Sequence, residues 1–180
     1  GTGKTTLCRI LAGYLQPASG TVLADGMPLP RRGASLVQLI AQHPERMMDP
    51  AIPIRRSLAE ATTEPEDAQA LASWEEKGGG IEGGSTVPQL LESLGVQREW
   101  LERFPVELSG GELQRCCIAR ALIARPRYLI CDEISTMLDA ATQAYLWRFL
   151  IDHAQANGIG MVLVTHSDAL LDRIATRIVE

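Results

Sequence analysis

The feature that most constrains the fold is an alternation of apolar runs of strand length with segments of helical periodicity. The runs "RYLICDE" (127–133) and "IGMVLVTHS" (159–167) are nearly continuously apolar, which is typical of buried strands of a parallel sheet. Between them, "ATQAYLWRFLIDHAQANG" (141–158) predicts an amphipathic helix that ends in Asn-Gly, a helix stop signal. The residues predicted on its buried stripe are Leu146, Phe149, Leu150 and His153. Strands that alternate with helices predict an α/β fold, with a parallel sheet flanked by helices.

The first part of the chain has the same alternation. Leucine and isoleucine at helical spacing predict a helix that begins near Lys4 and continues to about Leu15. The segment "TVLADGMPL" (21–29) predicts a short strand that ends in an Asp-Gly turn. A second strand is predicted within "ASLVQLIAQHP" (34–44), where the proline stops it.

A more polar, helical segment interrupts this alternation. We expect the 180 residues to form a single domain, in which 1–56 and 126–180 make the α/β core. Residues 57–125 are then an inserted helical subdomain. Within it, the glycines of "EEKGGGIEGGS" (75–85) predict a flexible surface loop.

Composition excludes several classes of function. The apolar content of 46% and charged content of 22% are typical of globular proteins, and the net charge of -5 argues against a nucleic-acid partner. No apolar run approaches the roughly 18 residues of a membrane span, and the start does not resemble a signal peptide. The cysteines lack metal-ligand spacing, so we expect small core residues of a cytoplasmic protein at Cys8, Cys116, Cys117 and Cys131.

The chain opens with "GTGKTTL", which matches the second half of a phosphate-binding loop. In such a loop, glycines let backbone N–H groups surround phosphate oxygens, the lysine neutralises phosphate charge, and the next hydroxyl binds Mg²⁺. The candidate phosphate-binding residues lie at the start of a predicted helix, and Thr5 is also the candidate Mg²⁺ ligand: Gly1, Thr2, Gly3, Lys4, Thr5 and Thr6. An ordinary helix start remains the alternative for this half-motif.

Two acids follow the predicted strand in "YLICDEIS" (128–135). Ligands bind α/β sheets at the carboxyl ends of their strands, so this position suits two functional carboxylates. Asp132 would hold Mg²⁺, and Glu133 would orient or deprotonate an attacking water. A solvated turn that happens to contain two acids is the alternative.

A third motif, "ELSGGELQRCCIARAL" (107–122), predicts a capped helix. Ser109 is a good N-cap and Glu112 follows three residues later, as in a capping box. The hydroxyl and the glycine amides of Gly110 and Gly111 also make a second anion site. One chain needs no second site for one triphosphate, unless this site serves a nucleotide held by another subunit.

These motifs together resemble those of the ATP-binding-cassette ATPases. The motif "LSGGELQR" resembles the signature of that family. Five further elements occur in the family's order between residues 1 and 166: "GTGKTTL", "QLIAQHP" with Gln42, "LICDE", "STMLDA" with Asp139, and "LVTHS" with His166. Within the family, "VQLIAQHPERMMDP" and "SGGELQRCCIARAL" are most similar to ATPase subunits of oligopeptide, dipeptide and nickel importers. The resemblance implies a P-loop NTPase core with an inserted helical subdomain, and the cofactors ATP and Mg²⁺.

The resemblance also implies roles for single residues. Gln42 would sense Mg²⁺ and the attacking water, and His166 would bond the γ-phosphate and fix the geometry of Glu133. Ser109 and Gly111 would close over the nucleotide of an opposing subunit, with Asp139 at that interface. The working unit would be a homo- or heterodimer of ATPase subunits, bound to transmembrane permease subunits and served indirectly by a solute-binding protein.

The chain also departs from the family pattern. The family usually has proline after the catalytic glutamate, where this chain has Ile134, and Ser-Ala where it has Thr136 and Met137. The resemblance further leads us to expect a sequence that is incomplete at both ends, without the leading loop glycine, the first strand and the N-terminal β-subdomain.

Three functions fit these observations. The first is the ATP-binding and hydrolysing subunit of an importer for a peptide, metal or similar small solute, held at the inner face of the cell membrane through its permease. The second is a cassette ATPase that drives a soluble complex. The third is a nucleotide-binding module without turnover.

Overall fold

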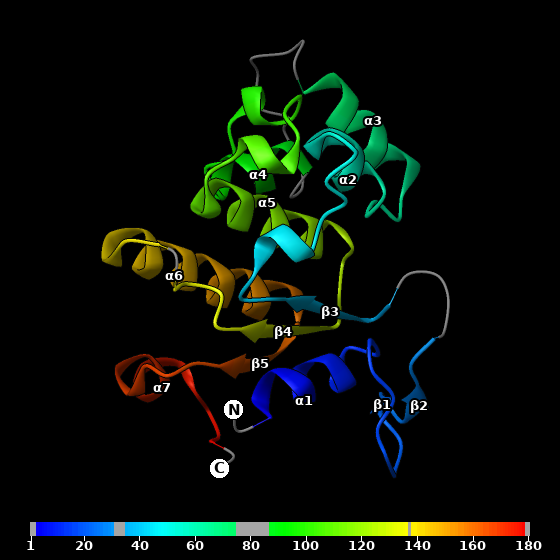
Figure 1. Cartoon of the computed structure of the whole chain (residues 1–180), viewed down its shortest axis with the longest axis vertical. Coiled ribbons are helices and arrows are strands. Elements are labelled where there is room, and N and C mark those ends of the chain that lie inside the picture. Colours follow the sequence, from blue (N-terminus) through cyan, green and yellow to red (C-terminus); the bar gives the residue numbers. More distant parts are fainter. Residues whose placement is uncertain (1–2, 31–34, 75–86, 137, 179–180) are drawn as a thin grey trace. The chain divides into compact units, whose positions relative to one another are not determined.

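The computed structural model describes residues 3–30, 35–74, 87–136 and 138–178, and the chain divides into two compact units (Figure 1). One unit comprises 1–42 with 126–180, and the other comprises 43–125. The predicted glycine-rich loop at 75–85 lies outside the described residues, and the boundary predicted at residue 57 stays a prediction.

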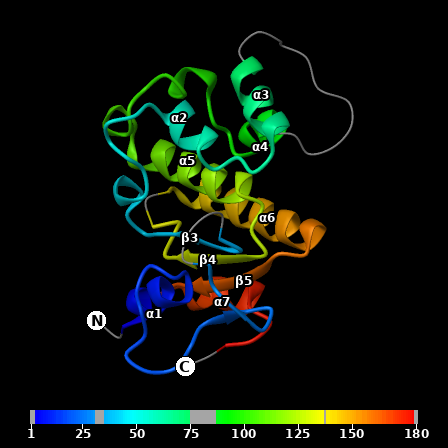
Figure 2. The same cartoon turned by 90° about the vertical axis from the view of Figure 1, so that its right-hand side faces the viewer.

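A parallel sheet forms the centre of the first unit. Its strands are β3 (Val37–Ile40), β4 (Tyr128–Asp132) and β5 (Gly160–Val164), and β4 lies between the other two (Figures 1 and 2). Val37 pairs with Tyr128, and Tyr128 pairs with Gly160, so the three strands run in register from one end. The predicted α/β class with a parallel sheet is therefore confirmed.

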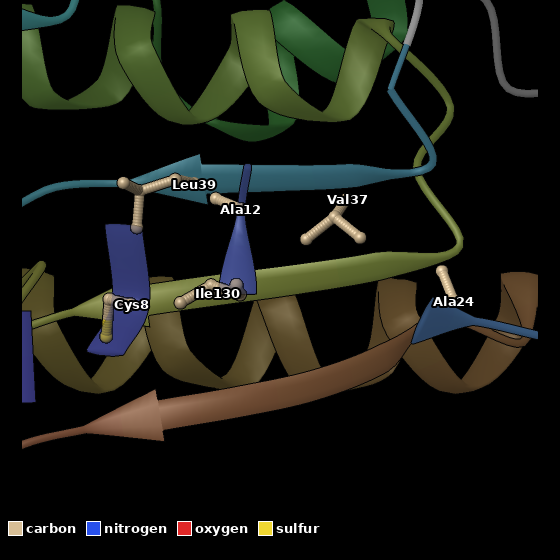
Figure 3. Close-up of a cluster of buried hydrophobic side chains, with 6 residues drawn as sticks. All are labelled: Cys8, Ala12, Ala24, Val37, Leu39 and Ile130. Atoms are coloured by element: carbon tan, nitrogen blue, oxygen red, sulfur yellow. The ribbon is translucent and has the colours of Figure 1, made fainter. Parts of the chain in front are cut away.

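Helices cover both faces of this sheet. α1 (Lys4–Leu11) crosses one face and contacts β3 and β4, whereas α6 (Ala140–Asn157) lies on the opposite face (Figure 3). Between α1 and the sheet, small and branched apolar side chains pack together in the core: Cys8, Ala12, Ala24, Val37, Leu39 and Ile130. Their burial removes apolar surface from water, which is the main force that holds α1 on the sheet.

The start of α1 agrees with the sequence, but its end does not. The helix stops at Leu11 rather than near Leu15, because Gly13 adopts a φ of 81° that ends the helical turn. The predicted short strand before the Asp-Gly turn is confirmed as β1 (Leu23–Ala24), and a second strand after the turn, β2 (Met27–Pro28), pairs with it in a hairpin. Asp25 and Gly26 both have positive φ, as a two-residue turn between antiparallel strands requires.

The second sequence prediction that needs correction is the burial of β5. The strand is only partly buried, and Val162 is 41% exposed. The reason is that β5 pairs with β4 alone and forms an edge of the described sheet. The helix that follows, α7 (Asp168–Ile174), has no buried residue.

The apolar stripe of α6 differs in two members from the predicted one. Leu146 and Leu150 are buried as expected, but Trp147 and Ala154 complete the buried face. Phe149 and His153, which were predicted on the stripe, are half-buried and stack on each other with ring centroids 5.7 Å apart. The predicted stop is confirmed, because Gly158 ends α6 with a φ of 65°.

The second unit is helical. Its elements are η1 (Pro44–Arg46), α2 (Ile54–Ala59), α3 (Pro65–Ser73), α4 (Val87–Ser93), η2 (Arg98–Trp100), η3 (Pro105–Glu107) and α5 (Gly110–Ile123). α5 is the central helix and contacts α2, α4 and η1. Arg120 donates from Nε to the Ser57 carbonyl at 3.0 Å, and Arg125 pairs with Asp67 at 2.9 Å. These bonds tie the middle of α2 and the first turn of α3 to the C-terminal part of α5 and the residues just after it.

The four cysteines are buried and free, as the sequence predicts. Burial raises the pKa of the Cys8 thiol to about 11 and that of Cys117 to about 12, so both stay protonated and unreactive at neutral pH. Across the described residues, no helix is both long and apolar enough to span a membrane.

Acidification should destabilise the chain through His153. Burial lowers the pKa of this imidazole, so the folded state favours the neutral form. The contribution of neutral His153 to the free energy of unfolding is therefore fully present above about pH 6.5, the ordinary pKa of histidine. It is lost as the pH falls toward the lower pKa that His153 has in the folded state. We expect His153→Phe to lose less melting temperature than the unsubstituted chain between pH 7.5 and 5.5. Equal losses in thermal denaturation would contradict this assignment.

Candidate functional site

The candidate site lies where the three parallel strands end. Asp132, the last residue of β4, pairs with Val164, the last residue of β5. Gln42 follows two residues after β3, Glu133 directly follows β4, and His166 follows two residues after β5. Because the strands are parallel and in register, these three side chains lie together at the carboxyl ends of the strands, where α/β folds bind ligands.

The Glu133 carboxylate contacts both of the other side chains at these strand ends. Gln42 donates from Nε2 to Glu133 Oε2 at 3.0 Å, and His166 Nε2 lies 3.0 Å from Glu133 Oε1. The Glu133 side chain is 18% exposed, whereas that of His166 is 73% exposed. The carboxylate is thus largely sheltered, and each of its oxygens has a polar partner from a neighbouring strand end.

The backbone of Glu133 has an uncommon conformation. Its φ is 51°, in the left-handed region that few residues other than glycine adopt. Two bonds hold it there: the Glu133 N–H donates to the Val164 carbonyl at 2.9 Å, and the Thr136 hydroxyl donates to the Glu133 carbonyl at 3.2 Å. Strained backbone of this kind is concentrated at functional sites, where the surrounding bonds maintain it.

Asp132 lies beside Glu133 but is much more deeply buried, with 2% of its surface exposed. The pKa of the Cys8 thiol on α1 is raised mainly by burial and, to a lesser extent, by the negative charge of Asp132. No hydrogen bond or ion pair within the described part of the chain neutralises this carboxylate. A carboxylate is a ligand that Mg²⁺ prefers, so the place of Asp132 at the end of β4 is compatible with a cation.

The opening helix begins with N–H groups whose arrangement would suit an anion. Gly3 is its N-cap with a φ of 78°, and the Leu7 N–H donates to the Gly3 carbonyl at 2.9 Å. The first N–H groups of a helix lack intrahelical partners and carry partial positive charge, which suits phosphate. Lys4, Thr5 and Thr6 are all exposed there. Gly1 and Thr2 lie outside the described residues.

The donor set fits Mg²⁺ rather than a transition metal. In the described ranges, no group of three His, Cys, Asp or Glu side chains is arranged to hold a metal. Magnesium instead takes one or two carboxylates, with water and substrate phosphates completing its shell. Asp132 would supply the carboxylate, Thr5 a hydroxyl, and Gln42 the oxygen of its amide, because its nitrogen donates to Glu133.

In the helical unit, the predicted capping box at the start of α5 is confirmed. The Glu112 N–H donates to Ser109 Oγ at 3.4 Å, and the Ser109 N–H donates to Glu112 Oε2 at 2.8 Å. The Ser109 N–H also lowers the pKa of the Glu112 carboxyl. Gly110 and Gly111 form the first turn, so their amides lie at the positive end of the helix.

Asp139 has a local structural role. It is the N-cap of α6 and accepts from the N–H groups of Ala141 and Thr142 at 3.1 and 3.0 Å. The Thr142 hydroxyl donates to its other oxygen at 2.6 Å and lowers the pKa of Asp139. The interface role implied by the family resemblance stays a prediction.

The structure therefore joins some of the predicted residues and not others. It brings Gln42, Glu133 and His166 together, with Asp132 on the same strand end. Lys4, Thr5 and Thr6 occupy the start of α1, and the Ser109 motif belongs to the other unit. Sequence reasoning missed Ser135 and Trp147, which bond to each other next to Glu133. A tryptophan at the third turn of α6 was the available signal.

This fold and the arrangement of its strand ends define an α/β domain of the P-loop type. The chain belongs to the ABC transporter family, which matches residues 1–136. It is 31% identical to a probable peptide ABC transporter ATP-binding protein of Sinorhizobium fredii, over 99% of this chain and 50% of that protein. It is 29% identical to a probable D,D-dipeptide transport ATP-binding protein of Escherichia coli, over 99% and 53%.

Solved structures show the same fold. One is a dimeric post-hydrolysis state of an ATP-binding cassette bound to ADP and Pi, with a TM-score of 0.69 and 20% identity over 93% of this chain and 72% of that chain. Another is an ATP-binding subunit of an ABC transporter, with a TM-score of 0.70 and 24% identity over 95% and 66%. The chain spans about half the length of the curated relatives named above.

Removal of the Ser109 cap should weaken the start of α5. We expect Ser109→Ala to lower the free energy of unfolding by about 1 kcal/mol, because the Glu112 N–H loses its acceptor. Ser109→Asn is the matched control, since asparagine supplies another acceptor and should cost less. Urea denaturation measures both; an equal loss in the two variants would show that the cap contributes little.

Proposed function

We propose that this chain is the nucleotide-binding and hydrolysing part of the ATPase subunit of an ABC importer. The observation that carries the proposal is the Glu133 carboxylate at the sheet edge, with Gln42 and His166 each 3.0 Å from one of its oxygens. A sheltered carboxylate with one amide and one imidazole partner suits the deprotonation or orientation of a water that attacks a phosphoryl group. Membership of the family supports ATP as the substrate.

The start of α1 binds the triphosphate in this proposal. The free N–H groups after Gly3 donate to phosphate oxygens, and Lys4 places its positive charge against them. Thr5, Asp132 and Gln42 hold Mg²⁺, which when bound neutralises phosphate charge. Thr6 adds a hydroxyl to the same helix turn. Together these groups stabilise the negative charge that develops on the γ-phosphoryl.

Glu133 and His166 act on the attacking water. Glu133 Oε1 or Oε2 accepts a proton from the water or orients it, and His166 Nε2 keeps the carboxylate in position while its exposed ring faces the γ-phosphate. Gln42, two residues after β3, holds the second oxygen. Each of these residues comes from a different strand end, so the geometry depends on the sheet rather than on one loop.

A second subunit completes each nucleotide site in this proposal. The N-terminus of α5, with Ser109, Gly110 and Gly111, provides N–H groups and a hydroxyl for the triphosphate held by the opposing subunit. Asp139 would lie at the interface between the two. The dimeric cassette among the similar structures supports this arrangement.

Transport follows from the partners. The peptide and dipeptide transport names of the relatives favour a peptide or similar small solute as the cargo. Permease subunits in the cell membrane would hold the ATPase dimer on their inner face, and a solute-binding protein would deliver the cargo to them. The choice of solute would belong to those subunits.

Replacement of the central carboxylate should abolish turnover without loss of binding. In the full-length subunit, we expect Glu133→Gln to reduce ATP hydrolysis at least about 100-fold, because the amide cannot accept the proton of water. ATP affinity should stay unchanged, and ATP should stabilise a dimer detectable by light scattering. Unimpaired hydrolysis would remove Glu133 from this role, and co-purification with a soluble complex instead of a permease would contradict the importer.

Lysine chemistry provides a second test. The sequence contains two lysines, Lys4 and Lys77, so acetic anhydride labelling followed by mass spectrometry compares them within one sample. Mg-ATP should protect Lys4 several-fold, because phosphate occupies its amine, and should leave Lys77 as the internal control. Equal protection of both lysines, or of neither, would contradict phosphate binding at Lys4.

A further inference from the structure

A hydrogen bond from the interior of α6 reaches the connection that carries Glu133. The indole Nε1 of Trp147 donates to Ser135 Oγ at 3.2 Å, and Ser135 is two residues after Glu133. Trp147 is 4% exposed, so its N–H is sheltered from water and depends on this acceptor. Trp147 belongs to none of the motifs that the sequence analysis identified.

Two other side-chain bonds of this connection lie further from Glu133. Gln143 Nε2 donates to the Leu138 carbonyl at 2.8 Å, and Asp139 caps α6. These two bonds fix the end of the connection that adjoins α6. The bond from Trp147 instead joins the buried face of α6 to Ser135, two residues from Glu133.

The conformation of Glu133 requires such support. Its left-handed φ of 51° is unfavourable for a glutamate, so it persists only where surrounding bonds maintain it. On one side, β5 supplies the Val164 carbonyl; on the other, Thr136 bonds the Glu133 carbonyl at 3.2 Å. Ser135 lies between Glu133 and Thr136, and Ile134 is buried at 2% exposure. Trp147 therefore fixes Ser135 in the middle of the segment 133–136, while Thr136 at its far end bonds back to Glu133.

We propose that Trp147 is a positioning residue for the hydrolytic reaction, acting through Ser135 to hold the segment 133–136 so that the Glu133 carboxylate faces Gln42 and His166. The proposal rests on the proposed function of Glu133 and adds a residue to it from the opposite face of the sheet. Trp147 touches neither substrate nor metal. Its contribution is the rigidity of the segment, and a misplacement of about 1 Å can cost up to 100-fold in rate.

Two variants remove the bond from opposite ends. Trp147→Phe keeps an aromatic ring but lacks the N–H, and Ser135→Ala removes the acceptor with little change in volume. Leu150→Val is the matched control, because Leu150 is buried at 1% on the same helix and also loses volume without touching Ser135. Ser135→Ala remains informative even if Trp147→Phe fails to fold.

The kinetic test uses the full-length subunit. We expect Trp147→Phe and Ser135→Ala each to lower kcat for ATP hydrolysis about fivefold or more, with KM for ATP within twofold of the unsubstituted value. The double variant should be no worse than the worse single variant, because both remove one bond. Leu150→Val should lower the melting temperature but leave kcat unchanged. Unchanged kcat in both single variants, or additive losses in the double variant, would overturn the proposal.

Hydrogen–deuterium exchange separates this proposal from the proposed function. In nucleotide-free protein, Trp147→Phe and Ser135→Ala should each speed exchange of the amides of 133–136 about tenfold, and Leu150→Val should not. If the unsubstituted subunit hydrolyses no ATP, the proposed function fails, while faster exchange would still support the positioning of Glu133 by Trp147. Unchanged exchange in both variants would overturn the positioning role whatever the activity.

Discussion

The parallel pairing of β3, β4 and β5 is the constraint on which the site depends. Ile40 pairs with Cys131, and Asp132 pairs with Val164, so the residues that follow each strand reach the same edge. A shift of one residue in either pairing would turn alternate side chains to the other face and separate Glu133 from Gln42 or His166. The apolar packing of α1 on β3 and β4 opposes such a shift (Figure 3).

Burial strengthens the electrostatic interactions of the two acids at the end of β4. The residues just before the acids, Ile130 and Cys131, are at most 2% exposed, so charge at Asp132 and Glu133 lies against an apolar strand. Electrostatic interactions are stronger where water is excluded. The buried Asp132 is thus suited to a cation, and the less buried Glu133, which has two polar partners, is suited to a water.

Local sequence signals predicted the parts of the structure that local physics determines. The strand in "YLICD", the start of α1 and the capping box at Ser109 follow from residues close together in sequence. Errors arose where distant residues decide: β5 is half exposed because it is an edge strand of the described sheet. The bond between Trp147 and Ser135 was missed because no spacing rule reveals which buried indole meets which hydroxyl. The roles of Ser109 and Asp139 toward another subunit are not tested by one chain.

The most direct measurement is a crystal structure of the full-length subunit with Mg²⁺ and a non-hydrolysable ATP analogue. The account predicts that the γ-phosphate lies between the start of α1 and the ends of β4 and β5, with the Lys4 amine on its oxygens and a water between it and Glu133. A nucleotide bound elsewhere, or a triphosphate out of reach of both Lys4 and Glu133, would contradict it.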